Sequence, residues 1–342
     1  MCGIIGYVGN RTAAPLLVDG LRTLEYRGYD SAGLFVPGNE PVRAVGPIDN
    51  LAAKLPTALT GSSGIAHTRW ATHGAPTEEN AHPHLDMSGT IAVVHNGIIE
   101  NFRELKEGLI VQGISFESDT DTEVLAKLIG SRHTGNLLQA VREALSMVRG
   151  TYGIAVLSSK QPDTVITARL GSPIVLGLAA DGNLVASDTA ALLAHTKDVV
   201  YLDDGECAVI TPTSYEIMTL SGQKRAKTQE TVEWDVESVK KQGYEHFMLK
   251  EIFEAPEVLE NTIRGRLLPE KGRAKLGGLE PVLSTLTKLD RLMIVGCGSA
   301  YYAGQVGRYL LEEYAGLPTE VELGSEYRYK RNLPDKNSAV LA

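Results

Sequence analysis

The first 220 or so residues alternate short apolar runs with turn-forming residues, a pattern typical of closely spaced β-strands. Gly, Pro, Asn and Asp separate the runs, as at 171–173, 181–183 and 203–205. The runs lie at 91–94, 152–156, 165–168, 174–178, 184–186, 199–202, 207–210 and 216–218. Because the connections are short, the pattern predicts antiparallel sheets.

Four other stretches carry apolar residues at helical spacing. They cover 14–23, 101–111, 122–129 and 137–148. Gly113 follows the second stretch as a stop signal, and Thr120 with Glu123 forms a capping-box pattern at the start of the third. Helices interspersed among antiparallel strands predict an α+β fold in which helices cover the sheets.

The pattern changes beyond residue 225. Residues 239–266 are rich in charge with apolar residues at helical spacing, and we interpret them as a connecting segment that docks on the next domain. An apolar strand at 292–296 then runs through a Gly-containing turn into an apolar helix at 304–314, which predicts the start of a parallel βαβ unit. Residues 339–342 have the character of the next strand, so we expect the sequence to be part of a longer protein.

Composition narrows the functional classes. The 342 residues are 43% hydrophobic and 22% charged with a formal net charge of −9, which argues against a nucleic-acid-binding protein. The three cysteines (Cys2, Cys207 and Cys297) are odd in number and far apart, which favours a reducing compartment, and we expect a cytoplasmic protein. The sequence contains no apolar run of about 18 residues and no signal-peptide pattern, so we expect no membrane association.

Cys2 is a candidate nucleophile because of its place in the chain. Cleavage of Met1 would leave a residue with both a thiol and a free α-amine. An α-amine has a reference pKa of about 7.7–8.0, so it can act as a base near neutral pH beside a strong nucleophile. The alternative is a small buried cysteine without a chemical role.

Five of the eight histidines lie between residues 67 and 95. His82 and His84 have the spacing of metal ligands. However, no cysteine or carboxylate cluster joins them at ligand spacing, so we favour hydrogen-bonded structural histidines over a metal site.

Four other polar positions each have two interpretations. Arg69 suits a substrate carboxylate or a plain surface position. Asn96 and Gly97 could supply an amide and a backbone N–H to an oxyanion, or they could form a tight turn. Asp121 could bind a substrate ammonium group, or it could be a first-turn carboxylate that the helix dipole favours.

Together these residues resemble the class II, N-terminal-nucleophile glutamine amidotransferases. The resemblance rests on five separated motifs in the family's order, at 1–4, 27–33, 67–74, 95–99 and 118–123. Within that class, the Arg-Gly-Tyr-Asp-Ser-Ala-Gly motif at 27–33 resembles the glutamine–fructose-6-phosphate aminotransferases, also called glucosamine-6-phosphate synthases. Residues 246–252 and 297–299 resemble that group's entry into its sugar-isomerase domain.

The resemblance implies a role for each matching position. Cys2 would attack the side-chain amide of glutamine, Asn96 and Gly97 would form the oxyanion hole, and Trp70 would be a gate toward an ammonia channel. The residues implied in glutamine binding are Arg27, Gly28, Arg69, Thr72, His73, His82 and Asp121, of which Arg69 and Asp121 would hold the α-carboxylate and the α-amine. The positions that match part of the sugar-phosphate site are Cys297, Gly298 and Ser299.

The resemblance also implies the architecture and the partners. It predicts a four-layer αββα sandwich over 1–220, a linker with docking helices over 221–285, and an incomplete α/β sugar-isomerase (SIS) domain over 286–342. It implies no metal and no cofactor. The full-length enzyme would transfer ammonia from glutamine to fructose 6-phosphate, giving glucosamine 6-phosphate, and would dimerise through the isomerase half. Residues 1–342 by themselves would only hydrolyse glutamine.

One departure from the family's sequence pattern and two alternative functions stay open. The family often has Thr-Ser where this chain has Ser299 and Ala300, and its Ser-rich phosphate loop and its isomerase glutamate, histidine and lysine are not in this sequence. The first rival is a class II amidotransferase with another acceptor, against which the strand–Gly–helix pattern after 292 argues. The second is a non-enzymatic sugar-phosphate sensor, against which the joint presence of Cys2, Arg69, Asn96 and Asp121 argues.

Overall fold

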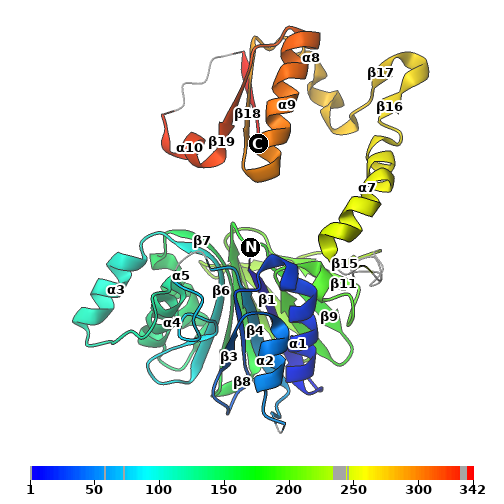
Figure 1. Cartoon of the computed structure of the whole chain (residues 1–342). Helices are drawn as coiled ribbons and strands as arrows, with labels where there is room; N and C mark the ends of the chain where they lie inside the picture. Colours follow the sequence, from blue (N-terminus) through cyan, green and yellow to red (C-terminus); the bar gives the residue numbers. More distant parts are fainter. Residues whose placement is uncertain (1, 58, 72–73, 234–243, 245, 332–336) are drawn as a thin grey trace. The chain divides into compact units, whose positions relative to one another are not determined.

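A computed structural model describes residues 2–57, 59–71, 74–233, 244, 246–331 and 337–342 (Figure 1). The chain forms two compact units, Met1–Lys250 and Glu251–Ala342. The division differs in position from the predicted linker at 221–285, whose role as a linker stays a prediction. Thr72 and His73 lie outside the described residues.

Two antiparallel sheets form the centre of the first unit. The first has the strand order β15-β11-β9-β10-β1-β4-β2-β3 and the second has the order β14-β13-β12-β8-β7-β6-β5. The strands of the first are β1 (Gly3–Gly9), β2 (Ser31–Phe35), β3 (Val42–Val45), β4 (Ser63–Arg69), β9 (Val175–Ala179), β10 (Gly182–Ala186), β11 (Asp198–Tyr201) and β15 (Glu230–Thr231). Those of the second are β5 (His84–Leu85), β6 (Ile91–Ile99), β7 (Gly150–Ser158), β8 (Gln161–Leu170), β12 (Glu206–Ile210), β13 (Tyr215–Thr219) and β14 (Lys224–Arg225).

Side-chain alternation along the strands builds four layers. On β1, Ile5 packs toward the helix α1 (Ala13–Leu24), whereas Ile4 belongs to the core between the two sheets. On β6, Val93 packs toward the helix α4 (Asp121–Arg132), whereas Val94 joins the core between the sheets. Helices α2 (Ile48–Lys54), α3 (Phe102–Val111) and α5 (Leu137–Met147) complete the outer layers (Figure 1). The predicted αββα sandwich is confirmed.

The helices and strands predicted in the first 220 residues coincide with observed ones and extend beyond them by one residue at most, but the sequence pattern missed several elements. Strands β1, β2 and β4 were not among the predicted strands, although they are neighbours in the interior of the first sheet. Every residue of these three strands is buried, so neither face alternates with polar residues. The short helix α2 was missed as well, since it buries only two side chains, Ile48 and Leu51.

The second unit has a small parallel sheet with strand order β19-β18-β20. Strand β18 (Arg291–Gly296) leads through Cys297 into α9 (Gly298–Ala315), as the strand–Gly–helix pattern predicted. The other elements are α7 (Phe247–Ile263), which crosses the unit boundary, β16 (Leu267–Leu268), β17 (Arg273–Ala274), α8 (Leu283–Leu286), β19 (Thr319–Leu323), α10 (Gly324–Tyr329) and β20 (Ser338–Leu341).

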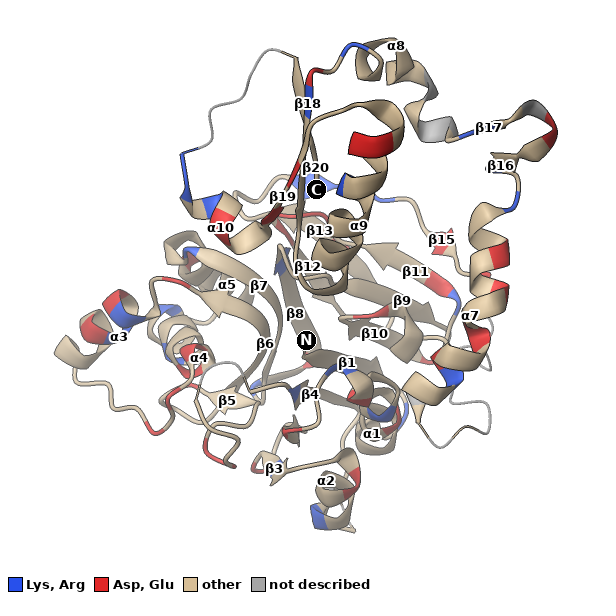
Figure 2. Cartoon of the chain, turned by 45° about the horizontal axis from the view of Figure 1, so that its top comes forward, with Lys and Arg blue, Asp and Glu red and all other residues tan. Residues whose placement is uncertain are grey.

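Charged side chains of both signs alternate along α3, whereas those of α7 are acidic after Lys250 (Figure 2). Over the whole sequence, 42 acidic and 33 basic residues give a formal net charge of −9. Within the described part of the chain, the helices are all too short or too polar to cross a membrane.

Candidate active site

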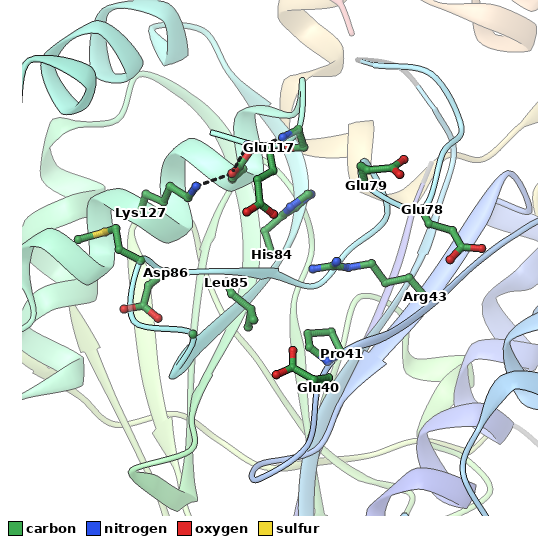
Figure 3. Close-up of a pocket in the computed structure, with 14 residues that line it drawn as sticks. Glu40, Pro41, Arg43, Glu78, Glu79, His84, Leu85, Asp86, Glu117 and Lys127 are labelled. Carbon is green, nitrogen blue, oxygen red and sulfur yellow. Dashed lines mark hydrogen bonds and ion pairs between the residues drawn. The ribbon is translucent and has the colours of Figure 1, made fainter. Parts of the chain in front are cut away.

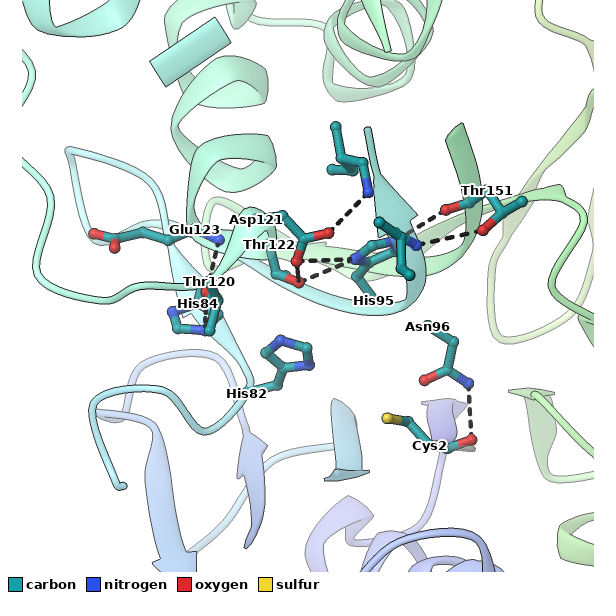
Figure 4. A network of polar contacts seen from close by, with 12 residues as sticks. Cys2, His82, His84, His95, Asn96, Thr120, Asp121, Thr122, Glu123 and Thr151 are labelled. Atoms are coloured by element: carbon teal, nitrogen blue, oxygen red, sulfur yellow. Dashed lines mark hydrogen bonds and ion pairs between the residues drawn. The ribbon is translucent and has the colours of Figure 1, made fainter. Parts of the chain in front are cut away.

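Cys2 lies directly before β1, beside the end of β4. The pairing of Gly3 with Thr68 places the cysteine next to Trp70, whose backbone N–H donates a hydrogen bond to Cys2 Sγ at 3.3 Å. On the other side, Asn96 Nδ2 donates to the Cys2 carbonyl oxygen at 3.0 Å. Figure 4 shows Cys2, His82 and Asn96 converging on one region. The half-buried thiol therefore sits where the ends of two facing strands, β4 and β6, meet.

A small pocket opens at this sulfur. Its lining combines the chain start, the end of β4, the centre of β6 and the first turn of α4, which lie far apart in sequence. The lining residues are Cys2, Arg69, Trp70, His82, His95, Gly97, Thr120, Asp121 and Thr122. Its cavity volume of about 30 Å³ is the size of about one water molecule. Seven predicted site residues thus meet at this place, if Asn96 beside it is included.

The surroundings of the Cys2 thiol act on its pKa in opposite directions. Burial raises the pKa and is the largest effect, while the hydrogen bond from the Trp70 N–H and the positive charge of Arg69 lower it. Nearby Asp30 raises it further, and the net shift is upward. At neutral pH the sulfur is therefore a thiol, and a nucleophilic attack requires a base to take its proton.

Asn96 and Gly97 lie inside β6, so the tight-turn interpretation is wrong. Gly97 pairs with Tyr152 of β7 and has a φ of +133°, a conformation that side chains other than glycine rarely adopt. A Cβ atom at this position would come within 2.2 Å of the Thr151 carbonyl oxygen. The Asn96 side chain is fixed at both ends, because its Oδ1 lies 3.0 Å from His67 Nε2 while Nδ2 bonds to Cys2.

Arg69, at the end of β4, and Asp121, at the start of α4, both line the pocket. The Arg69 side chain donates to the carbonyl oxygens of Ala75 and Gly74 at 3.2 and 3.1 Å. Burial lowers the pKa of Arg69, against the raising effects of Cys2, Asp121 and Asp30, and its guanidinium stays charged. Asp121 is the first residue of α4, and its Oδ2 accepts a hydrogen bond from the Ile99 N–H at 2.8 Å.

Three buried histidines line the interior beside the pocket. Burial lowers the pKa of His67 and of His84 to about 3, and it lowers the pKa of His82 well below its usual value. They are therefore neutral at physiological pH and form one contact series, with ring centroids 4.2 Å apart for His67–His82 and 5.0 Å apart for His82–His84. Among the described residues, no group of three or more His, Cys, Asp and Glu side chains could hold a metal ion.

The predicted gate residue is exposed at the pocket edge. Trp70 is 42% exposed, and its ring makes a T-shaped contact with the Tyr29 ring, with 5.4 Å between the centroids. The loop before Tyr29 closes on the same strand end, since a Cβ on Gly28 would come within 2.6 Å of the Trp70 nitrogen. Gly28 therefore permits a close backbone approach beside the nucleophile.

Arg27 lies beside this loop with partners of its own. It is in the 3₁₀ turn Glu25–Arg27 and pairs with Asp188, and its guanidinium carbon lies 5.4 Å from the centre of the Tyr26 ring. Neither Arg27 nor Gly28 belongs to the residues that line the small pocket. Their role in glutamine binding stays a prediction.

The three predicted sugar-phosphate residues belong to the second unit. Cys297 is exposed and precedes α9, where Gly298 has a φ of +57° and Ser299 follows in the first helical turn. They therefore form a strand-to-helix turn whose backbone N–H groups suit an anion. Their function stays a prediction as well.

Sequence reasoning missed polar residues that hold the site together. Asp30 Oδ2 accepts the Ala71 N–H at 2.8 Å, which holds the chain directly after Trp70. His95 lies 3.0 Å from Thr122 Oγ1 and 3.3 Å from the Thr151 oxygen, and so links β6 to α4 and β7. His67 contacts Asn96. Asp30 and His67 lay within the family-like motifs, but their contacts depend on strands that the sequence pattern did not predict.

A second cavity, separate from the small pocket at Cys2, lies beside His84 (Figure 3). Its cavity volume is about 470 Å³, and no predicted site residue lines it. His84 forms part of the wall, with its Nε2 at 2.9 Å from Thr120 Oγ1. Thr120 also caps α4 by accepting the Glu123 N–H at 3.2 Å, as the capping-box pattern predicted, whereas the Glu123 carboxylate accepts the N–H groups of Glu117 and Ser118.

Comparison with protein families identifies two regions of this chain. A glutamine amidotransferase domain model matches residues 57–262, and an SIS domain model matches residues 285–342. Proteins named glutamine–fructose-6-phosphate aminotransferase [isomerizing] are similar over 100% of this chain. Those of Chlorobaculum tepidum and Thermus thermophilus are each 48% identical. This chain covers 57% and 56% of their respective lengths, so it spans little more than half of these relatives.

Solved structures with a similar fold confirm the predicted fold class. Glutamine phosphoribosylpyrophosphate amidotransferase from B. subtilis matches with a TM-score of 0.56 and 23% identity, over 94% of this chain and 65% of its own. A structure described as the allosteric regulatory enzyme of purine biosynthesis matches with a TM-score of 0.54 and 23% identity, over 98% and 68%. At this identity the likeness concerns the fold alone.

Proposed function

The chain belongs to the glutamine amidotransferase family, and from this premise we propose that it hydrolyses glutamine to glutamate and ammonia at Cys2. One observation carries the proposal. The Cys2 thiol shares a small pocket with a guanidinium (Arg69), a carboxylate (Asp121) and the N–H-bearing strand segment at Gly97. These groups supply a nucleophile, a binding partner for each end of an amino acid, and an oxyanion donor.

The first step requires a base at the nucleophile. Removal of Met1 gives Cys2 a free α-amine whose reference pKa of about 7.7–8.0 leaves a useful neutral fraction near pH 7. The raised pKa of the Cys2 thiol keeps the proton on sulfur until attack. The amine takes this proton, directly or through a water molecule, as sulfur adds to the side-chain amide carbon of glutamine.

The tetrahedral intermediate then collapses with its atoms in balance. The oxyanion is stabilised by an N–H of the Asn96 side chain and by the Gly97 backbone N–H. The protonated amine returns its proton to the leaving nitrogen, so ammonia departs and a γ-glutamyl thioester remains on Cys2. Water attacks this thioester, and glutamate leaves with regeneration of the thiol.

The two charged residues orient the substrate from its far end. Arg69 binds the α-carboxylate and Asp121 binds the α-ammonium group, which fixes the amide carbon relative to sulfur. We assign Thr72, His73 and His82, with the loop residues Arg27 and Gly28, to the same substrate site. Trp70, exposed at the pocket edge, is the proposed gate for departing ammonia.

The experiment that tests this function combines mass and activity. Mature protein should lack Met1, release glutamate from glutamine, and be labelled at Cys2 by a glutamine-mimicking electrophile. Cys2→Ala should abolish release, whereas Cys297→Ala removes an exposed thiol in the other unit and should leave release unchanged. Retention of Met1, or labelling at another cysteine, contradicts the proposal.

For the whole protein we propose transfer of this ammonia to fructose 6-phosphate, giving glucosamine 6-phosphate. The support is the printed name of the relatives and the SIS-domain match at 285–342. We keep 1–220 as the glutaminase domain, 221–285 as a linker and 286–342 as part of the isomerase domain, with Cys297, Gly298 and Ser299 at the sugar phosphate. We also propose a cytoplasmic homodimer. Formation of glucosamine 6-phosphate by residues 1–342 alone would contradict this assignment.

A further inference from the structure

We propose that His67 is a positioning residue that holds the Asn96 amide with its nitrogen turned toward Cys2. The inference rests on the proposed glutaminase function, because it assigns Asn96 to the oxyanion. His67 lies on β4 of the first sheet and Asn96 on β6 of the second, so the contact crosses the interior between the sheets. No motif or family resemblance assigned His67 a role.

The direction of the first hydrogen bond follows from atom types. His67 Nε2 lies 3.0 Å from Asn96 Oδ1, and an amide oxygen only accepts hydrogen bonds. His67 Nε2 must therefore carry the hydrogen and donate it. The other end of the same amide agrees, because Asn96 Nδ2 lies 3.0 Å from the Cys2 carbonyl oxygen, which also only accepts.

The charge state of His67 follows from its surroundings. Its side chain is fully buried, its neighbours His82, His95 and Arg69 carry no negative charge, and burial lowers its pKa to about 3. A neutral imidazole has a single N–H, so donation from Nε2 leaves Nδ1 as an acceptor. His82 Nδ1 lies 3.1 Å from His67 Nδ1 and 3.2 Å from Nε2, so it packs against the ring and its position selects neither tautomer.

The consequence is a pair of hydrogen bonds that run in one direction, from His67 to Asn96 and from Asn96 to Cys2. Asn96 Nδ2 has two hydrogens, and the Cys2 carbonyl takes one of them. The second is the donor that the mechanism assigns to the oxyanion. Without a donor at Asn96 Oδ1 the amide could rotate by half a turn, which would present an oxygen to the developing negative charge.

Substitutions of His67 test this role by their effect on kcat. His67→Met removes the donor at similar length, and we expect kcat for glutamine hydrolysis to fall about 100-fold, the usual loss for one oxyanion donor. KM should change less than about threefold, since Arg69 and Asp121 are untouched. His67→Gln places an amide N–H at the same reach and should restore kcat to within about tenfold. The matched control is His84→Met, a buried histidine that contacts Thr120, with kcat within about fivefold.

A double-mutant cycle separates positioning from general support of the fold. In an Asn96→Ala background, His67→Met should lower kcat by less than about twofold, because the group that it positions is gone. If His67→Met costs the same factor in both backgrounds, or if the single variant keeps normal kcat, the inference is wrong.

One measurement needs no variant and no activity. Histidine-selective ¹⁵N spectra of the native protein distinguish the two neutral tautomers, and His67 should show a protonated Nε2 and a bare Nδ1. A protonated Nδ1 or a charged ring at pH 7 overturns the inference even in an active enzyme. Conversely, loss of the glutaminase assignment through the Cys2 tests would leave this spectrum unchanged, so the two failures are distinguishable.

Discussion

At the scale of single residues, the carboxylate of Asp121 has a structural contact and, in the proposed function, a substrate contact as well. Its Oδ2 accepts the Ile99 N–H at 2.8 Å, and this bond ties the start of α4 to the end of β6. Its Oδ1 lies 4.0 Å from His95 Nδ1, beside the pocket. The Ile99 N–H requires only an acceptor oxygen, whereas a substrate ammonium group would require the negative charge of the carboxylate.

Asp121→Asn tests this division of roles. The amide oxygen can still accept the Ile99 N–H, so stability should change by less than about 1 kcal/mol. The lost charge should raise KM for glutamine about 10- to 100-fold in steady-state assays. The matched control is Asp119→Asn, an exposed neighbour two residues away, with unchanged KM.

An analogue of glutamine without its α-amino group sharpens the result. The native enzyme should discriminate strongly against this analogue, whereas Asp121→Asn should turn over glutamine and analogue with similar kcat/KM. A variant that keeps full discrimination would show that another group binds the ammonium.

The sequence predicted many of the residues that line the pocket but not those that hold them in place. The chemistry of Cys2, Arg69, Asn96, Gly97 and Asp121 left two interpretations open for each, and the resemblance to the amidotransferases decided between them. The structure places these residues around one sulfur. His67 gave no such signal, since a buried histidine in a strand also fits a purely structural role. Its partner Asn96 is 29 residues away in the opposite sheet, and only the pairing of the sheets brings them together.

At the scale of secondary structure, Gly97 is where strand geometry sets the site. Its φ of +133° lies inside a regular pairing of β6 with β7, next to the Asn96 side chain. A Cβ would meet the Thr151 oxygen at 2.2 Å, so β6 and β7 would have to separate to admit even alanine.

Gly97→Ala should therefore be costly in stability and activity. We expect a loss of about 3 kcal/mol in the free energy of unfolding, from backbone strain of about 1–3 kcal/mol and from the overlap. Gly113→Ala is the control, because Gly113 has a φ of +84° but an added Cβ would meet open space. Urea unfolding should show only the strain cost there, about 1 kcal/mol. Equal losses for both variants would contradict the role of the overlap.

Buried strands explain which elements the sequence could not predict. The runs at 165–168 and 207–210 were recognised as strands because turn residues bound them. Strands β1 and β4 carry Gly, His, Thr and Arg at buried positions, so their polar residues were interpreted as chemistry instead of as strand positions. Their pairing is fixed by contacts with β10 and β2, which are distant in sequence.

At the scale of the whole molecule, buried histidines couple stability to pH. His67 and His84 are neutral in the fold down to about pH 3, but in the unfolded chain they protonate below about pH 6.5. Between these values the unfolded state binds more protons, so the free energy of unfolding falls as pH falls. Each such histidine contributes a slope of about 1.4 kcal/mol per pH unit.

His84→Gln tests this coupling. Its amide can still donate to Thr120 Oγ1, so the variant removes the titration while it keeps the hydrogen bond. The loss of stability between pH 6 and pH 5, measured by urea unfolding, should shrink by about 1 kcal/mol relative to the native protein. His133→Gln, half-buried at the end of α4, is the control. The same pH dependence in native protein and His84→Gln would contradict this account.

The two units differ in how much core they bury, and this difference predicts unequal local stability. The first unit has three clusters of buried apolar side chains. Among the described residues of 251–342, Ile294 at 8% exposure is the one apolar side chain of comparable burial. Local opening costs little where few apolar contacts are lost.

Hydrogen exchange of backbone amides should therefore be faster in the second unit than in the first. Backbone amides of β18 should exchange at least about 100-fold faster than those of β6, although each of these strands pairs with a strand on both sides. Ile294→Ala should accelerate exchange further in β18 and β19 while it leaves β6 unchanged, because Ile294 packs near Gly304 of α9 and has no part in the first unit's core. Protection of β18 equal to that of β6 would show that buried apolar area does not set the stability of the second unit.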